Sequence, residues 1–185
     1  LQMTRGEVDL AVINMNGVPP ALHSQHLYDE SYVLIGRRGH PSLRADLTVD
    51  EFAQLEHVVV SLRGGGFSTS VDHALVAHGL RRNVVHSASS FLPVPELVAQ
   101  SDCVALVPSR LVDGRSEQLL CVAPPLPVEG FAIGLFWHER SDGHAGLPDG
   151  IGDGARLRSL SHCPAARARA RRTAGSTPAG AVRRG

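Results

Sequence analysis

The chain has 185 residues, of which 43% are hydrophobic, enough for one large domain or two small ones. Its formal net charge is zero, but all acidic residues lie at or before Asp153, and residues 154–185 hold arginines without any acidic residue. The acidic body therefore lacks the charge of a nucleic-acid-binding surface, and the basic tail predicts nonspecific contact with phosphates at most.

The three cysteines lie far apart and form no CxxC pair, so the sequence predicts neither a disulfide framework nor a metal site. Cys103 and Cys121 lie in apolar runs and are predicted to be buried thiols. No segment approaches the roughly 18 apolar residues that a membrane helix needs, and no signal peptide opens the chain. We expect a protein of the reducing cytoplasm, with no membrane contact and no cofactor.

Two strands are predicted in the first part of the chain. Residues 6–13 contain the first strand, residues 14–20 form a loop, and residues 27–36 form a long second strand rich in β-branched and aromatic side chains. Because the chain begins in the middle of an element, we expect that a segment before Leu1 is absent.

A helix start is predicted at Thr48. Thr48 and Glu51 have the spacing of a capping box, and Leu47 and Phe52 have that of a hydrophobic staple. We therefore expect a helix that ends near Leu55.

Residues 56–107 predict a βαβαβ unit with parallel strands and right-handed crossovers. The wholly apolar run at 103–107 indicates a strand buried on both faces of a sheet, and the run at 58–60 indicates a second buried strand. The strands are expected at 58–60, 83–86 and 103–107, and the helices at 71–80 and from about 93. Residues 87–90 are read as a polar elbow after the second of these strands.

The end of the chain is predicted to contain two more strands and a tail. The strands are expected at 119–122 and 131–137, and the tail is expected to be disordered because its apolar periodicity stops. The long strand at 27–36 and the strand at 131–137 would be the two segments that pass between the lobes and form a hinge.

This order of elements resembles the effector-binding domain of LysR-type transcriptional regulators. Five segments carry the resemblance, at residues 6–12, 27–41, 47–52, 97–108 and 136–140. The sequence of residues 105–111 looks most like that of the branch that senses aromatic acids and nodulation flavonoids. The resemblance implies an α/β fold of the type II periplasmic-binding-protein class, with mostly the second lobe, the hinge strands and an incomplete first lobe.

The resemblance also implies a division of the chain. Residues 1–26 would be a remnant of the first lobe, residues 27–140 the second lobe with the hinge strands, and residues 141–185 a disordered tail rich in Arg, Ala and Gly. The family's winged helix-turn-helix is absent from the sequence, so we expect a truncated regulator.

The family's function implies a small anionic or aromatic effector, bound between the two lobes, that controls transcription. DNA would be bound only through the missing N-terminal domain, and the complete protein would form dimers or tetramers. An enzyme is not expected, since the chain contains no GxSxG elbow, HExxH motif or paired carboxylates.

The predicted effector-binding residues lie at strand ends, where ligands bind in open α/β sheets. The glycine-rich corner (residues 64–70) offers backbone N–H groups and hydroxyls. The serine-rich corner (residues 87–91) offers hydroxyls and a ring. An arginine near the last strand offers a positive charge. They are Gly65, Gly66, Phe67, Ser68, Ser70, Ser89, Ser90, Phe91 and Arg140. Helix capping and core packing are the alternative roles for the two corners, and a solvated strand end is the alternative for Arg140.

Two other functions stay open at this point. The same fold serves the solute-binding proteins of transporters, although the unpaired cysteines and the lack of an export signal speak against that role. A non-functional remnant of a regulator is the third possibility.

Overall fold

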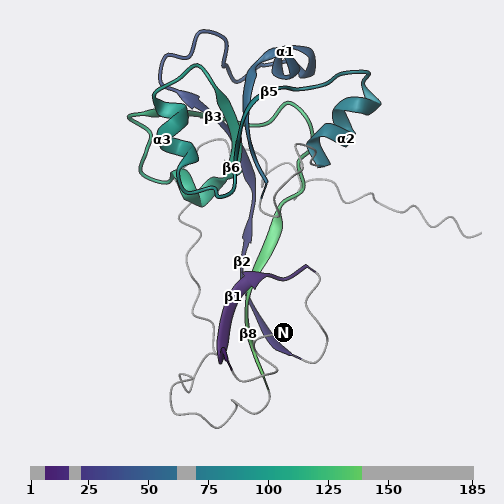
Figure 1. Cartoon of the computed structure of the whole chain (residues 1–185), viewed down its shortest axis with the longest axis vertical. Helices are drawn as coiled ribbons and strands as arrows, with labels where there is room; N and C mark the ends of the chain where they lie inside the picture. Colours follow the sequence, from purple (N-terminus) through teal and green to yellow (C-terminus); the bar gives the residue numbers. More distant parts are fainter. Residues whose placement is uncertain (1–6, 17–21, 62–69, 139–185) are drawn as a thin grey trace, which may run out of the picture. The chain divides into compact units, whose positions relative to one another are not determined.

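The computed structural model describes residues 7–16, 22–61 and 70–138. These residues fall into two compact units. The first unit contains residues 7–16, 22–31 and 129–138, and the second contains residues 32–61 and 70–128. Figure 1 allows each unit to be followed along the chain. The predicted tail at 141–185 lies outside the described residues, and the predicted division into lobes stays a prediction.

The first unit is a three-stranded antiparallel sheet with the order β1–β8–β2. Its strands are β1 (Leu10–Asn14), β2 (His23–Glu30) and β8 (Phe131–Trp137). The central strand β8 has the bounds that the sequence predicts. At one end of the sheet the ring of His23 stacks on that of Trp137, with centroids 5.7 Å apart.

The second unit is built on a five-stranded sheet with the order β5–β4–β6–β3–β7. Strand β4 pairs in parallel with both β5 and β6, whereas β3 is antiparallel to β6 and β7. The predicted common direction of the three strands of the βαβαβ unit is thus confirmed. The strands are β3 (Tyr32–Arg37), β4 (Glu56–Val60), β5 (Asn83–Ala88), β6 (Val104–Pro108) and β7 (Leu119–Val122).

Helices cover both faces of this sheet, with α3 on one side and α1 and α2 on the other (Figure 1). Strand β3 shows why both faces are apolar: Leu34 belongs to one buried cluster, whereas Val33 and Ile35 belong to the other. The helices are α1 (Val49–Gln54), α2 (Ser70–Ala77) and α3 (Val94–Ala99), followed by the 3-10 turn η1 (Ser109–Val112).

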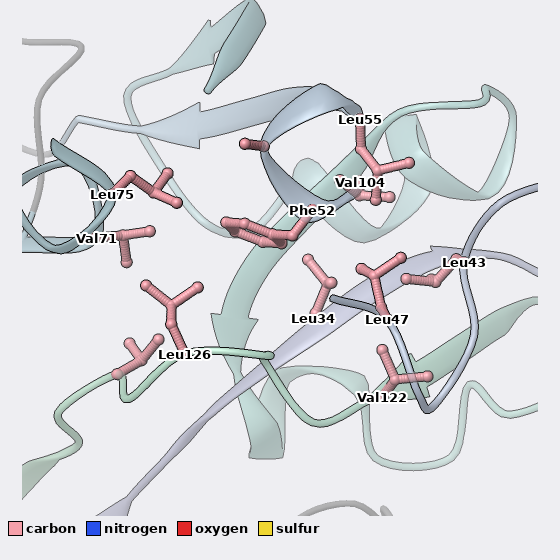
Figure 2. Packing of buried hydrophobic residues seen from close by; sticks show 12 residues of the cluster. Leu34, Leu43, Leu47, Phe52, Leu55, Val71, Leu75, Val104, Val122 and Leu126 are labelled. Atoms are coloured by element: carbon pink, nitrogen blue, oxygen red, sulfur yellow. The ribbon is translucent and has the colours of Figure 1, made fainter. Parts of the chain in front are cut away.

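Phe52 is central to the cluster beneath α1 and α2. It is fully buried, and Figure 2 shows its ring pointing into the middle of the cluster, with Leu75 of α2 on one side and Leu34 of β3 on the other. Burying a side chain of this size contributes roughly 1.5–3 kcal/mol relative to leaving it exposed. This packing fixes both helices against the sheet.

The predicted capping box of α1 is present. The hydroxyl oxygen of Thr48 accepts the N–H of Glu51 at 3.3 Å, and the Glu51 carboxylate accepts the N–H of Thr48 at 2.9 Å. The N–H of Thr48 and the guanidinium of Arg44 lower the pKa of Glu51 to about 2. The local sequence therefore determines where this helix begins.

Several sequence-based boundaries are wrong, and two of them bear on the candidate site. The long strand predicted at 27–36 is interrupted at Ser31, because β2 pairs with β8 in the first unit and β3 pairs with β6 and β7 in the second. The polar elbow starts at Ser89 rather than Ser87, because the pairing of β5 with β4 continues to Ala88.

Candidate functional site

The carboxyl ends of β4, β5 and β6 lie at the same edge of the five-stranded sheet. The register places Val60 opposite Ala88, and the N–H of Ser61 donates to the carbonyl oxygen of Ala88 at 2.9 Å. Strand β3 runs the other way, so its first residue, Tyr32, lies opposite Pro108 at this edge. We call this end of the sheet the carboxyl edge (Tyr32, Ser61, Ser89–Phe91 and Pro108).

The serine-rich corner lies at the carboxyl edge, as predicted. Ser89 is exposed, and Ser90 and Phe91 are half-buried. The hydroxyl oxygen of Ser90 accepts the N–H of Leu92 at 3.2 Å, so this side chain also stabilises the turn that leads into α3. Ser89 is therefore the more accessible of the two serines.

The glycine-rich corner is described only at its end. Ser70 is the first residue of α2 and is exposed. The other predicted residues of this corner and the predicted arginine lie outside the described residues, and their assignment stays a prediction. They are Gly65, Gly66, Phe67, Ser68 and Arg140.

The sequence-based prediction missed Tyr32. Its ring lies 6.4 Å from that of Phe91, centroid to centroid, with the planes inclined at 48°. Tyr32 was assigned only to the middle of the predicted strand at 27–36. Its place at the carboxyl edge depends on where β3 begins and on its antiparallel pairing, which no local pattern in the sequence reports.

The opposite end of the sheet, which we call the amino edge, holds polar groups bound to one another. The guanidinium of Arg82 binds the carboxylate of Asp72 through two nitrogens at 2.8 and 2.5 Å, and the Arg82 side chain is only 3% exposed. The guanidinium of Arg37 donates to the carboxylate of Asp102 at 2.6 Å. An open hollow of about 620 Å³ beside the Arg82–Asp72 pair also lies at this edge, away from the predicted site.

His57 is fully buried at the amino edge. Its Nε2 lies 2.7 Å from the carbonyl oxygen of Phe52, which fixes Nε2 as the donor, and its Nδ1 has no hydrogen-bond partner within the described part of the chain. Burial lowers the pKa of His57 to about 4. This histidine is therefore neutral near pH 7 and contributes to the core.

Among the described residues no group of three or more His, Cys, Asp or Glu side chains could hold a metal ion. Cys103 is buried, as the sequence predicts, whereas Cys121 is half-buried rather than buried. No helix within the described ranges is long and apolar enough to span a bilayer.

Comparison with known protein families decides the assignment. Residues 2–147 match the model of the LysR substrate binding domain. The chain belongs to this family. The LysR-type domain thus accounts for most of the sequence, and the resemblance seen in the sequence is confirmed.

Curated relatives of this LysR-type domain are transcriptional regulators. The regulator LinR of Sphingobium indicum is 33% identical over 141 residues, covering 74% of this chain and 46% of the relative. The activator NahR of Pseudomonas putida is 32% identical over 140 residues, covering 75% and 46%. Nodulation protein D 1 of Bradyrhizobium diazoefficiens is 28% identical over 137 residues, covering 73% and 44%. The chain spans less than half the length of these relatives, and they agree with the predicted aromatic-acid and nodulation branch.

Solved structures support the fold. The regulatory domain of MexT, a transcriptional activator in Pseudomonas aeruginosa, has a TM-score of 0.61 at 23% identity, covering 78% of this chain and 70% of that one. A probable transcriptional regulator from the same organism has a TM-score of 0.64 at 22% identity, covering 75% and 47%. The predicted α/β class, similar to periplasmic binding proteins, is confirmed.

Proposed function

We propose that this domain senses a small anionic or aromatic effector for a LysR-type transcriptional regulator, and that the effector contacts the carboxyl edge. The alignment of three parallel strand ends at one edge, with exposed Ser89 and half-buried Phe91, carries the proposal. Ligands in open α/β sheets bind beyond such ends.

The proposed contacts combine the described corner with residues that flank it in the sequence. Ser89 and Ser90 supply hydroxyl groups, and Phe91 supplies an apolar wall. The remaining proposed contacts are Gly65, Gly66, Phe67, Ser68, Ser70 and Arg140.

In the whole protein, binding of the effector shifts the equilibrium between two conformations of a DNA-bound oligomer in the cytoplasm. The shift is limited by the difference in effector affinity between the two conformations. DNA contact belongs to a helix-turn-helix domain outside this chain, as the names of the curated relatives suggest. No enzymatic step is part of this proposal.

Calorimetric titration of the 185-residue chain with a panel of aromatic carboxylates tests the effector site. Ser89→Ala removes one hydroxyl and is expected to weaken binding about 2- to 10-fold, since a neutral hydrogen bond contributes about 0.5–1.5 kcal/mol. Ser116→Ala, an exposed serine near the amino edge, is the matched control and should leave the affinity unchanged. Equal affinities for the Ser89→Ala variant and the unsubstituted chain across the panel would reject this site.

The transport alternative is set aside, because the curated relatives are transcriptional regulators. The reading frame around this domain tests the regulatory role. A helix-turn-helix domain joined to it supports regulation, whereas an export signal joined to it contradicts that role.

A further inference from the structure

We propose that Tyr32 acts with Phe91 as an aromatic clamp that makes the carboxyl edge select effectors with a planar aromatic ring. This inference rests on the proposed function and adds a specificity-determining residue to it. The observation that carries it is the ring pair itself, with centroids 6.4 Å apart and planes inclined at 48°.

The two rings come from opposite faces of the sheet. Tyr32 packs against the buried cluster that contains Leu34 and Phe52, beneath α1 and α2. Phe91 packs against the other cluster, which contains Val94 and Val98 of α3. Each ring therefore packs against a different part of the core, and the two rings lie side by side at the carboxyl edge.

This support makes the pair a preorganised surface. Both side chains are half-buried, so part of each ring is accessible while the rest is fixed by packing. A side chain that is already ordered loses little conformational entropy when a ligand binds, and this raises affinity. A third apolar group, Leu92, follows Phe91 in sequence and is 76% exposed.

The clamp lies at the same edge as the proposed hydrogen-bonding groups. Tyr32 is opposite Pro108 in the register, and the exposed Ser89 directly follows the last residue of β5. An effector with a ring and an attached polar group would therefore meet aromatic and hydroxyl side chains together. Aromatic pairs prefer offset or edge-to-face contacts with centroids 4.5–7 Å apart, a spacing that a third ring can continue.

Ring-on-ring contact predicts a measurable preference. Its contribution beyond simple area burial corresponds to roughly a 2- to 10-fold gain in affinity. A saturated ring of similar size with the same carboxylate keeps the area and the charge but loses this contact. Benzoate and cyclohexanecarboxylate are such a pair.

The test is calorimetric titration of the 185-residue chain with benzoate and cyclohexanecarboxylate. The unsubstituted chain should bind benzoate more tightly, and both Tyr32→Leu and Phe91→Leu should lower that preference about 2- to 10-fold by weakening benzoate alone. Tyr32→Phe keeps the ring and should keep the preference. Tyr28→Leu, which changes the other tyrosine of the chain, is the matched control and should have no effect on the ratio.

Four results would contradict the clamp, and a fifth would contradict the proposed function as well. A preference unchanged in both leucine variants, an equal loss of both ligands, or a loss of preference in Tyr32→Phe would each contradict it. Binding of both acids by the unsubstituted chain without a preference contradicts the clamp but leaves the proposed function standing. Binding of neither acid contradicts the proposed function itself. The two leucine variants alter different faces of the core, so if one does not fold, the other still decides.

Discussion

The two ends of the five-stranded sheet differ in what their polar and aromatic side chains contact. At the amino edge Arg82 binds Asp72, Arg37 binds Asp102, and His57 binds a backbone carbonyl inside the core. At the carboxyl edge Ser89 is exposed, and the rings of Tyr32 and Phe91 are half-buried against each other. The comparison teaches that the polar groups of the amino edge bind one another, whereas the carboxyl edge leaves hydroxyl and aromatic groups at least partly exposed, which is where we propose that the effector binds.

The largest effect on stability is expected from breaking the ion pair at the amino edge. Asp72→Ala leaves the guanidinium of Arg82 without its carboxylate partner, while the Arg82 side chain stays only 3% exposed. Removing one partner of a buried pair costs about 3–5 kcal/mol, and since Asp72 is 20% exposed we expect about 3 kcal/mol. Urea unfolding measures this loss.

A surface ion pair provides the matched control. Arg44 lies 3.0 Å from Asp46, and these side chains are 48% and 82% exposed. Asp46→Ala should change the free energy of unfolding by less than about 1 kcal/mol. A loss of the same size in both variants would contradict a special structural role of the amino edge.

The pH dependence of stability sharpens the same comparison. Because burial lowers the pKa of His57 to about 4 from its ordinary 6.5, the unfolded chain binds a proton below about pH 6.5 that the folded chain does not. Stability that is present at neutral pH is therefore lost as the pH falls from about 6.5 towards 4, by roughly 2–3 kcal/mol for this residue.

His57→Gln removes this titration and keeps a donor for the carbonyl oxygen of Phe52. The difference in unfolding free energy between pH 7 and pH 4.5 should shrink in this variant. His73→Gln changes an exposed histidine on α2 and should leave the difference as it is. If both variants keep the acid dependence of the unsubstituted chain, His57 is not its source.

A smaller effect is expected at the start of α1. Thr48→Ala removes the side chain that accepts the N–H of Glu51, and loss of such a cap costs about 1 kcal/mol. Thr48→Ser keeps the hydroxyl and should retain most of the stability. The midpoint of urea unfolding, at an unchanged m-value, is the measurement. A midpoint that does not move in the alanine variant would show that packing alone fixes this helix.

Local patterns predicted the parts of the fold that depend on neighbouring residues. The capping box at Thr48 and Glu51 and the last strand at 131–137 are found where the sequence places them. The common direction of β4, β5 and β6 followed from the alternation of apolar runs with helices. These features need no knowledge of distant partners.

Features that depend on residues far apart in the chain could not be predicted from local patterns in the sequence. The interruption at Ser31 carries no glycine or proline and arises because the strands on either side pair in different sheets. The contact of Tyr32 with Phe91 joins residues from opposite faces of one sheet. Phe91 was therefore predicted as part of the serine-rich corner, whereas Tyr32 was not predicted as a site residue.

Amide hydrogen exchange of the 185-residue chain, with and without saturating benzoate, tests the central claim most directly. We predict slower exchange in peptides that cover residues 86–92, at the carboxyl edge, and unchanged exchange in peptides that cover residues 78–83, at the amino edge. Slower exchange confined to residues 78–83, or no change at residues 86–92 when benzoate is bound, would contradict the assignment of the effector to the carboxyl edge.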